Sequence, residues 1–463
     1  MVWAIVLFVC VTAALKLNGY QPTAINDKFT ISRMPRARTK GVTRPSELKV
    51  TSNVLSLKKR ADANSLSSIY VQAMRGKGGV SRVKNGTTTL KAVEGGQVHA
   101  VDVTVGGQNF SVVVDTGSSD PWLAIKGFEC YDLDNTPLPQ SACEFGPTYD
   151  PSRSSTYAVV PNQNFNISYA DGEYLNGAMG NETFTMAGIT VPNQRFGVVN
   201  IAAWLGDGVT SGLVGFAYRS LTSAYGGTTP GSDVKTQAML YNPLFVNMYE
   251  QQGVPSIFSM AIDRDESVGG ILALGGIPDI KHSPYFVTTP ILPAGVNAAR
   301  ELVYQFYTID IDGFAISSNR STQFNVYNNV NPLKTPLIGN GTDVIVDSGT
   351  SLCYVPDDVA DGLAAAFVPP ATYDSSNDAY FVDCNATVPV FGVGIGKKIF
   401  YVNPADLIID LYGDGSICVM GIQPNFGGLT ILGGTWMKNV LAVFDIGAEQ
   451  MRFAARQWSS VSD

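Results

Sequence analysis

One short motif occurs twice in this sequence, and the duplication constrains the fold more than any other feature. The first copy, VVDTGSS, covers residues 113–119, and the second, IVDSGTS, covers residues 345–351. An apolar-apolar-Gly triplet follows each copy, at residues 213–215 and at residues 431–433. Each repeat therefore predicts a buried strand that ends in an aspartate, a tight glycine turn and a second buried strand further on. Two related lobes that face one another would have this pattern.

The rest of the chain after about residue 97 alternates short apolar runs with Gly, Pro, Asn and Asp. Examples are VHAVDVTV (98–105), FSVVVD (110–115), FNISYA (165–170), TIDIDGFAI (308–316) and IFYVN (399–403). These are strand lengths bounded by turn residues, so a mostly β body is expected. With 463 residues and 45% apolar residues, the chain is large enough for about two or three folding units.

Helices are expected at only a few places. The runs at residues 242–253 and 359–367 have helical character, and the first ends at Gly253. The run GVGIGKK (392–398) superficially resembles a phosphate-binding loop, but it lacks the required spacing and the following Ser or Thr. We interpret it as a hairpin turn.

The two motif aspartates, Asp115 and Asp347, suggest a specific chemistry. A carboxylate at the end of a buried strand is costly unless hydrogen bonds satisfy it. If the lobes bring the two carboxylates within about 3 Å, both cannot ionise together and they share one proton. The ionised member can then take a proton from water while the protonated member donates to a carbonyl oxygen. This predicts hydrolysis of an amide bond without a metal or a covalent intermediate.

The residues beside these aspartates are suited to support them. Glycine lets the backbone turn closely and present its amide to a carboxylate. Hydroxyl groups can tie the two loops together or hold the outer carboxylate oxygens. The candidate supporting residues are Thr116, Gly117, Ser118, Ser348, Gly349 and Thr350.

Other chemistries find little support in the sequence. The chain has only two histidines, His99 and His282, which argues against sites that need several imidazoles, such as most zinc hydrolases. The serine-hydrolase motif G-x-S-x-G and the zinc motif H-E-x-x-H are both absent. The net charge of −8 argues against general nucleic-acid binding. We expect no metal and no cofactor.

The N-terminus indicates export. Residues 2–15 form an apolar run that is too short for a membrane span and ends at Lys16. It is typical of a secretory signal peptide over residues 1–19, cleaved after Ala14 or Gly19, although no basic residue precedes it. A buried N-terminal helix is the alternative. The C-terminus carries no hydrophobic tail, so no membrane anchor is expected and the protein is predicted to be secreted.

Charge separates the next segment from the body. Residues 20–91 contain 15 Lys and Arg against 3 Asp and Glu, a net charge of +12, whereas residues 92–463 carry −21. A basic propeptide that docks on the acidic body, and leaves on acidification, is therefore expected. A solvated basic tail is the alternative. The run Lys58-Lys59-Arg60 is suited to a processing protease, so the mature N-terminus lies after Arg60 or near Lys91.

Cysteines and glycosylation signals fit the same export route. Loss of Cys10 with the signal peptide leaves five cysteines, which allows two disulfides and one free thiol, or an intermolecular bond. Seven Asn-x-Ser/Thr triplets occur. Five are the preferred glycosylation candidates, Asn166, Asn181, Asn319, Asn340 and Asn385, and the others are Asn85 and Asn109.

Taken together, the motifs resemble those of the pepsin-like aspartic endopeptidases, in particular the type that fungi secrete. DTGSSDPW (115–122) is similar to the first active-site motif, and DSGTS (347–351) is similar to the second. ISYADG (167–172) resembles the flap hairpin. SGLVGFA (211–217) and LTILG (429–433) resemble the strands that brace the two active-site loops.

The resemblance covers roughly residues 97–456 and implies a bilobal β fold with the active-site cleft between the lobes. The implied N-terminal lobe with its flap is residues 92–285, and the implied C-terminal lobe is residues 286–463. The flap tyrosine would be Tyr169, whose hydroxyl is implied to reach the indole N–H of Trp122. The implied disulfides are Cys130–Cys143 and Cys384–Cys418, which leaves Cys353 as a buried free thiol.

Two flap residues differ from or refine the family pattern. Ala170 stands where the family usually has glycine, which is expected to stiffen the hairpin tip. Asp171 resembles an acid found in some fungal members that accept lysine beside the scissile bond. Replacing Asp171 with serine is expected to reduce cleavage after lysine selectively.

The resemblance also implies an extended peptide substrate, a monomeric enzyme and a propeptide that acts as an intramolecular inhibitor. A leader lysine, Lys84 or Lys91, is a candidate to pair with the dyad in the precursor. The alternative function is a catalytically silent binding or inhibitor protein of the same fold. Such proteins usually lose an aspartate or the flap tyrosine, and this chain keeps both. A glycosylated wall protein would need Ser/Thr-rich stalks or an anchor, which the sequence lacks.

Overall fold

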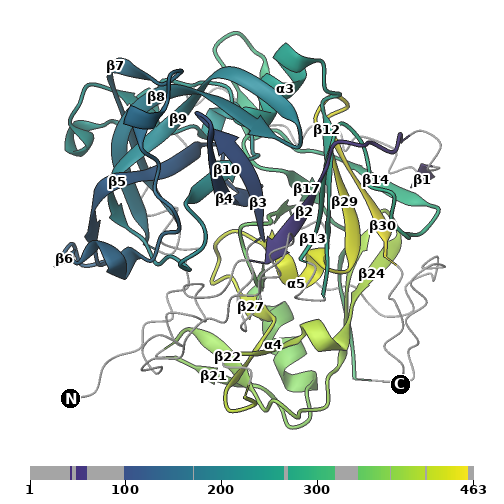
Figure 1. Cartoon of the computed structure of the whole chain (residues 1–463). Helices are drawn as coiled ribbons and strands as arrows, with labels where there is room; N and C mark the ends of the chain where they lie inside the picture. The colour runs from purple at the N-terminus through teal and green to yellow at the C-terminus, as the bar shows by residue number, and fades with distance from the viewer. Residues whose placement is uncertain are drawn as a thin grey trace, which may run out of the picture.

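The protein is a mostly β molecule of two lobes, as the sequence predicted. A shared central sheet, which the sequence did not predict, joins the two lobes (Figure 1). It is described here from a computed structural model. The structure describes residues 42–43, 48–59, 99–169, 172–264, 269–318, 343–375, 377–411 and 414–456. The expected signal peptide over residues 1–19 lies outside these ranges.

The N-terminal lobe is built from the strands on either side of the first motif and of the flap. In sheet order they run β3-β4-β10-β5-β9-β8-β7-β11, with β6 beside β5. Their bounds are β3 (His99–Val105), β4 (Gln108–Asp115), β5 (Pro121–Tyr131), β6 (Pro137–Leu138), β7 (Ala158–Ser168), β8 (Tyr174–Met186), β9 (Ile189–Ala203), β10 (Gly212–Gly215) and β11 (Ala224–Gly226).

The central sheet continues from β3 and is contributed by distant parts of the chain. Its order is β1-β14-β30-β29-β12-β13-β2-β3. The new strands are β1 (Val42–Thr43), β2 (Val54–Lys59), β12 (Ile257–Ile262), β13 (Gly270–Leu274), β14 (Phe286–Pro290), β29 (Val440–Asp445) and β30 (Gln450–Ala455). Strands from both ends of the chain therefore meet here, and the expected lobe boundary at residues 285–286 falls immediately before β14.

The C-terminal lobe consists of smaller sheets. One sheet carries the second motif and comprises β17 (Thr308–Asp310), β19 (Asp343–Val346), β28 (Ile431–Leu432), β20 (Cys353–Val355) and β27 (Ile422–Pro424). The others comprise β18 (Gly313–Ser317), β23 (Val390–Ile395) and β24 (Lys398–Val402); β21 (Thr372–Asp374), β22 (Ala379–Val382), β26 (Cys418–Met420) and β25 (Ile408–Asp410); and β15 (Gly295–Val296) with β16 (Leu302–Val303).

The duplicated motif has the same strand pairing in both lobes. β4 pairs in parallel with β10, so that Val114 faces Val214. β19 pairs in parallel with β28, so that Val346 faces Leu432. The prediction that each motif strand has a downstream partner strand is therefore confirmed.

The expected helices are present, with small differences at their ends. α3 (Leu244–Gln252) ends where Gly253 adopts a left-handed backbone with φ of 70°, a conformation that glycine tolerates. α4 (Asp357–Ala366) begins earlier than expected, with Asp357 and Asp358 in its first turn near the positive end of the helix dipole. The remaining described helix of this kind, α5 (Gly434–Met437), follows β28.

One hairpin prediction and one strand prediction had different outcomes. The run at residues 392–398 forms the β23–β24 hairpin, as predicted. The run at residues 308–316 was expected as one strand, and this is wrong. It divides into β17 and β18, because the first pairs with β19 and the second with β23 in another sheet. Gly313, with φ of 131°, begins the second strand at this break.

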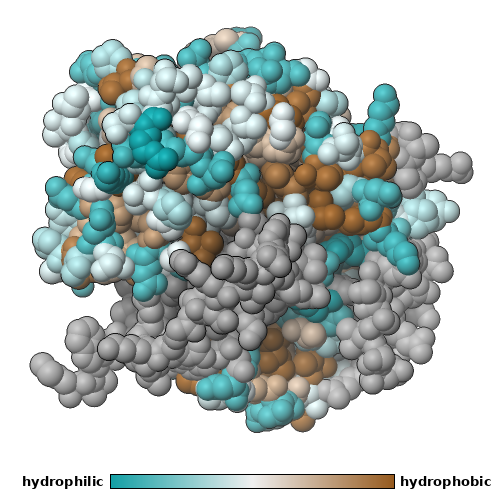
Figure 2. Space-filling model, in the orientation of Figure 1, coloured by the Kyte–Doolittle hydropathy of each residue, from teal (hydrophilic) through white to brown (hydrophobic). Residues whose placement is uncertain are grey.

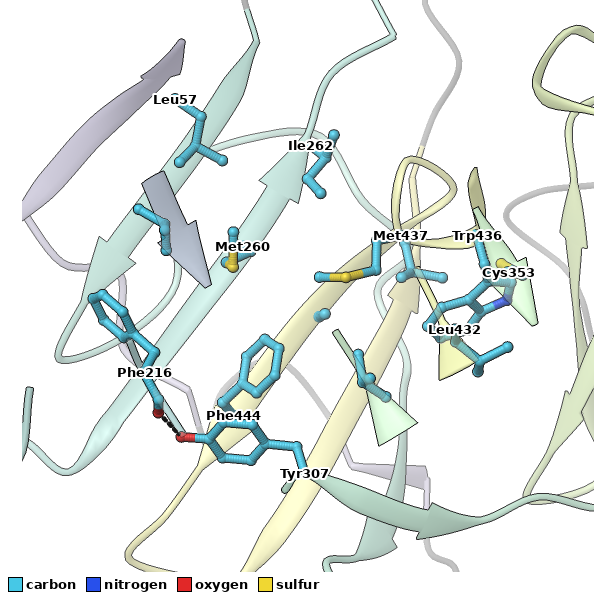
Figure 3. Close-up of a cluster of buried hydrophobic side chains, with 14 of the residues drawn as sticks. Leu57, Phe216, Met260, Ile262, Tyr307, Cys353, Leu432, Trp436, Met437 and Phe444 are labelled. Carbon is cyan, nitrogen blue, oxygen red and sulfur yellow. Dashed lines mark hydrogen bonds between the residues drawn. The ribbon is translucent and has the colours of Figure 1, made fainter. Parts of the chain in front are cut away.

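The main hydrophobic core joins the central sheet to both lobes, and a second core lies beneath the flap. Figure 3 shows the first core, where Leu57 of β2, Met260 of β12 and Phe444 of β29 contribute buried side chains. On the face in Figure 2, hydrophilic and neutral side chains cover most of the N-terminal lobe. Within the described part of the chain, no helix is long and apolar enough to cross a membrane.

Candidate active site

Asp115 and Asp347 lie at equivalent positions of the two lobes. Asp115 is the last residue of β4, and Asp347 directly follows β19. Both side chains are buried, with 6% and 8% exposure. Each of the two strands is paired in parallel with a partner strand, β4 with β10 and β19 with β28, which supports the strand end that carries the aspartate. The duplicated sequence thus places one carboxylate from each lobe at the junction between them.

Reciprocal hydrogen bonds between Thr116 and Ser348 connect the two loops. The Thr116 hydroxyl donates to the Val346 carbonyl oxygen (3.1 Å) and accepts from the Ser348 amide (2.9 Å). In the same way, the Ser348 hydroxyl donates to the Val114 carbonyl oxygen (3.0 Å) and accepts from the Thr116 amide (3.2 Å). Both hydroxyl side chains are fully buried, so this joint holds the lobes at a fixed spacing.

Each aspartate is also held by its own loop. The Gly117 amide donates to Oδ1 of Asp115 (2.7 Å), and the Ser118 hydroxyl donates to its Oδ2 (2.5 Å). For Asp347 these bonds come from the Gly349 amide and the Thr350 hydroxyl. They measure 2.9 Å and 2.6 Å. The structure therefore brings together all eight residues that the sequence assigned to the dyad and its support.

The glycines of the motif let each carboxylate approach the opposite loop. A Cβ atom at Gly117 would lie 2.6 Å from Oδ2 of Asp347. A Cβ atom at Gly349 would lie 2.3 Å from Oδ1 of Asp115. Both distances are shorter than a non-bonded contact allows, so only glycine leaves room for the two carboxylates to meet.

The environment raises the pKa of Asp115 well above its ordinary value. The largest cause is burial, which disfavours the charged form, and the charge of nearby Asp347 is the second. A hydrogen bond between the two carboxyl groups adds to the rise, while the bonds from Ser118 and Gly117 oppose it. Asp115 therefore holds its proton more tightly than an isolated aspartate does.

The flap is the hairpin of β7 and β8, and Tyr169 directly follows its first strand. The indole N–H of Trp122 donates to the Tyr169 hydroxyl (2.8 Å). The Tyr169 amide donates to the Glu173 carbonyl oxygen (2.8 Å), which closes the base of the turn. Burial is the main cause that raises the pKa of Tyr169, so its hydroxyl stays neutral. Ala170 and Asp171 lie outside the described residues.

An aromatic group beside the flap was not identified from the sequence. The ring of Trp204 lies 5.1 Å from that of Trp122 and 5.8 Å from that of Tyr169, edge to face in both pairs. It stacks on Phe145 at 6.0 Å. Trp204 follows β9 and belongs to no motif, so only the strand pairing brings it to the flap.

Asp120, a further residue that the sequence reasoning missed, lies fully buried at the end of the first motif. Its Oδ1 accepts hydrogen bonds from the Tyr241 hydroxyl (2.5 Å) and the Ser223 amide (2.9 Å). Burial raises its pKa to about 6, although these two donors oppose the rise. The sequence signal that could have identified Asp120 is its position within DTGSSDPW, but that position does not by itself show that the side chain is buried.

Tyr307 braces the first active-site loop from the side of the C-terminal lobe. Its hydroxyl donates to the carbonyl oxygen of Phe216 (2.6 Å), as Figure 3 shows. The Phe216 amide in turn donates to the carbonyl oxygen of Asp115 (2.7 Å). A fully buried side chain of one lobe thus supports the backbone of the other lobe's aspartate.

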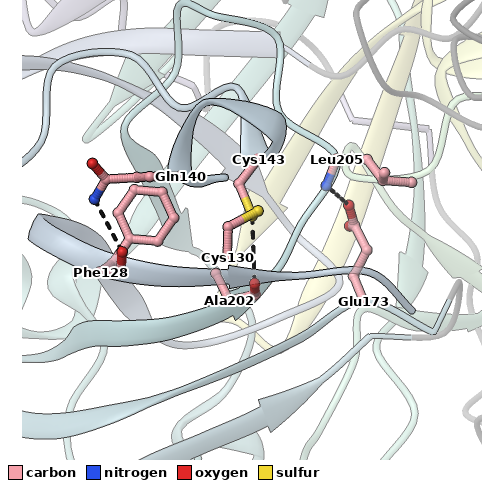
Figure 4. Close-up of a disulfide and its surroundings, with 7 residues drawn as sticks. All are labelled: Phe128, Cys130, Gln140, Cys143, Glu173, Ala202 and Leu205. Atoms are coloured by element: carbon pink, nitrogen blue, oxygen red, sulfur yellow. Dashed lines mark hydrogen bonds between the residues drawn. A yellow bond between two sulfur atoms is a disulfide. The ribbon is translucent and has the colours of Figure 1, made fainter. Parts of the chain in front are cut away.

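The structure contains two disulfides, Cys130–Cys143 and Cys384–Cys418, the pairs that the family resemblance implied. Figure 4 shows the first, where Sγ of Cys143 lies 3.4 Å from the carbonyl oxygen of Ala202. Cys353 is a buried free cysteine, and burial raises the pKa of its thiol to about 12. It packs in the main core as a small apolar side chain.

The glycosylation candidates differ in their surroundings. Asn385 is exposed, whereas Asn181 is partly buried. The side-chain amide of Asn166 donates to Asp233 (2.8 Å) and to the Pro230 carbonyl oxygen (3.0 Å), so its nitrogen is already engaged. Asn85, Asn319 and Asn340, together with Lys84 and Lys91, lie outside the described residues. Among the residues that the structure describes, no group of three or more His, Cys, Asp or Glu could hold a metal ion.

Comparison with known proteins finds a family model and curated proteins that are similar to this chain over most of its length. A family model described as "Eukaryotic aspartyl protease" matches residues 98–456. A protein of Aspergillus fumigatus named "Probable aspartic-type endopeptidase" is 45% identical over 385 residues, which cover 81% of this chain and 82% of that protein. Candidapepsin of Candida tropicalis is 26% identical over 381 residues, covering 81% of this chain and 83% of that protein.

The solved structures agree on the fold. The crystal structure of the aspartic proteinase from Irpex lacteus matches with a TM-score of 0.57 at 19% sequence identity. The match covers 79% of this chain and 96% of that one. The two chains thus share their two-lobed architecture.

Proposed function

The chain belongs to the eukaryotic aspartyl protease family and is an aspartic endopeptidase, and from this premise we propose that it is a secreted acid protease made as a zymogen. The observation that carries the proposal is the pair of buried carboxylates held together by reciprocal Thr116 and Ser348 hydrogen bonds. Asp115 and Asp347 would share one proton and form the catalytic dyad.

The proposed reaction needs only these two carboxyl groups and a water molecule. The ionised aspartate takes a proton from the water, which attacks the carbonyl carbon of the scissile peptide bond. The protonated aspartate donates to the carbonyl oxygen as the tetrahedral intermediate forms. The first aspartate then returns the proton from water to the leaving nitrogen, and the second takes a hydroxyl proton back. The C–N bond breaks to give an acid and an amine, and the dyad again holds one proton. The raised pKa of Asp115 supports the presence of a protonated member at acid pH.

The flap is proposed to close over an extended peptide. Tyr169, held by Trp122, would cover the peptide and exclude water from the dyad. Strand-like hydrogen bonds would hold the peptide backbone in the cleft between the lobes. The monomer supplies both aspartates, so no second subunit is needed.

The leader is proposed to keep the enzyme inactive. Its described residues include β2, which pairs with β13 and β3, and Leu57 is fully buried in the main core. Carboxylates that pair with the basic leader would have lowered pKa values. Their attraction is complete above the ordinary carboxylate pKa and is lost as the pH falls through the lowered values. Acidification would therefore release the charged part of the leader.

Secretion and glycosylation complete the proposal. The apolar run at residues 2–15 would direct export, and the relatives include a protein named "Secreted aspartic protease 3" from Candida albicans. Two disulfides are compatible with an oxidising compartment. Asn385 is the described candidate whose side chain is exposed for a glycan.

The test is hydrolysis of denatured haemoglobin or casein at about pH 4, before and after acid treatment of the purified precursor. We expect cleavage to appear on acidification and to stop with pepstatin, a general inhibitor of aspartic proteases. Asp115→Asn should abolish cleavage while leaving the protein folded by circular dichroism. The leader-free wild type and the Asp115→Asn variant are compared at equal concentrations of folded protein.

Failure would favour a different function. If folded, leader-free protein cleaves neither substrate across the acid range, the proposed protease is wrong. The alternative is then a catalytically silent binding or inhibitor protein of the same fold. The intact aspartates, their hydroxyl partners and the Tyr169–Trp122 bond all count against that alternative.

A further inference from the structure

A buried glutamate connects the flap to the segment that carries Trp204. Glu173 is 5% exposed and directly precedes β8, the second strand of the flap. Its Oε1 accepts a hydrogen bond from the Leu205 amide (2.7 Å), as Figure 4 shows. The pairing of β8 with β9 ends at Tyr174 and Ala203, so the bond between Glu173 and Leu205 lies outside the strand ladder and is additional to it.

The segment at residues 204–210, here called the Trp204 segment, is attached on its other side to the disulfide loop. The Gly206 amide donates to the Cys143 carbonyl oxygen (3.1 Å), and the Gly208 amide donates to that of Glu144 (2.6 Å). A Cβ atom at Gly206 would lie 2.3 Å from each of these two oxygens. The disulfide loop therefore fixes this segment at one edge, and the Glu173–Leu205 bond adds a link to the flap beside the β8–β9 pairing.

The Trp204 segment carries an aromatic side chain that contacts the flap tyrosine. The ring of Trp204 packs edge to face on Tyr169 at 5.8 Å and on Trp122 at 5.1 Å. Trp122 in turn donates to the Tyr169 hydroxyl. The three rings form one apolar group, and Glu173 joins the backbone beside Trp204 to the backbone of the flap.

We propose that Glu173 is a positioning residue that couples the flap to the Trp204 segment. The flap would then close as one unit with the aromatic group, and substrate side chains beside the scissile bond would meet a preformed apolar surface. A carboxylate suits this role because a hydrogen bond from an amide to a charged acceptor is stronger than one between neutral groups. The inference rests on the proposed protease function.

The first test separates substrate binding from the chemical step. Two peptides are compared that differ only in an aromatic residue or alanine beside the scissile bond. Glu173→Ala should raise KM for the aromatic peptide roughly tenfold, with kcat changed less than about threefold. Glu173→Gln keeps an acceptor oxygen and should restore KM to within about threefold of the wild type.

Glu182, which lies within β8, offers a matched control. It is also buried, at 0% exposure, and accepts hydrogen bonds from the Tyr149 hydroxyl and the Thr183 amide. These contacts lie outside the flap turn and the Trp204 segment. Glu182→Ala should lower Tm while leaving KM for both peptides close to the wild-type values. A KM for Glu173→Ala that matches Glu182→Ala would overturn the inference.

A second measurement does not depend on activity. Hydrogen exchange of the Leu205 amide is followed in the Asp115→Asn background, with and without Glu173→Ala. Loss of the Glu173 acceptor should speed this exchange about tenfold or more, without a similar change at the paired residues of β8. An unchanged Leu205 rate would also overturn the inference. If the wild type cleaves no peptide, the proposed function fails, while this measurement still decides whether Glu173 holds the Trp204 segment to the flap.

Discussion

At the scale of single residues, Asp120 beside the active-site loop makes the stability of the fold depend on pH. It is fully buried, and its Oδ2 atom has no hydrogen-bond partner among the described residues. Burial raises its pKa from 3.8 to about 6. The folded state therefore binds this proton more tightly than the unfolded state does, so stability falls as the pH rises from about 4 to about 6.

Asp120→Asn should remove this part of the pH dependence. The substitution also changes the unfolding free energy by an amount that does not depend on pH. For this reason only the change of stability with pH is compared. The rise from 3.8 to about 6 corresponds to roughly 3 kcal/mol of unfolding free energy. The unfolding free energy of the variant minus that of its parent should therefore increase by about this amount from about pH 4 to about pH 7.

The measurement is urea unfolding at several pH values, with Asp115→Asn as the parent so that self-digestion is absent. The dyad then contributes equally to both proteins and cancels from the comparison. Parallel stability curves for the two proteins across this pH range would show that Asp120 does not titrate as argued.

The site residues differ in how readily the sequence revealed them. Asp115 and Asp347 stand in a repeated motif whose hydroxyl and glycine neighbours have an evident chemical purpose. Trp204 and Glu173 carry no such local signal. The Trp204–Tyr169 contact and the Glu173–Leu205 bond both depend on the register that places Tyr174 opposite Ala203. Residues whose role comes from pairing between distant strands need the structure to be found.

At the scale of elements, the two motif loops are close-packed on one another. Gly349→Ala would place a Cβ atom 2.3 Å from Oδ1 of Asp115. Since the fixed Thr116–Ser348 joint prevents the loops from separating, the Asp115 carboxylate must move instead. We expect kcat/KM to fall at least about 100-fold and unfolding free energy to fall by about 1–3 kcal/mol.

Gly231→Ala is the control for this substitution, because a Cβ atom there would meet nothing within 4 Å. Peptide hydrolysis and thermal unfolding are measured for both variants. Activity of Gly349→Ala within a few-fold of Gly231→Ala would mean that the two loops are looser than the structure indicates.

Strand patterns predicted much of the element structure but not its division among sheets. The run at residues 308–316 has the composition of one strand, yet β17 and β18 pair with different partners. The structure of the leader was also only partly predictable from the sequence. Their basic composition suggested attraction to an acidic body, whereas β2 is held by strand pairing and by the buried side chain of Leu57.

At the scale of the whole molecule, this placement of the leader affects how it can be lost. Leader residues before Arg60 contribute the strand between β13 and β3, and thus bridge the central sheet and the N-terminal lobe. Further backbone hydrogen bonds join Lys49, Thr51 and Asn53 to residues 274–277. These bonds and the burial of Leu57 do not titrate in the acid range. Acidification alone should therefore leave this strand in place.

We accordingly predict that cleavage after Arg60 leaves the leader fragment bound. The precursor is nicked with a protease specific for paired basic residues and then passed over a sizing column at about pH 4. The fragment that ends at Arg60 should elute with the body and separate only in denaturant. Leu57→Asp buries a charge in the core and should release the fragment from the nicked protein. A fragment that dissociates from the nicked wild type would show that β2 is replaced or lost once the chain is cut, because its bonds are then too weak to hold it without the covalent link.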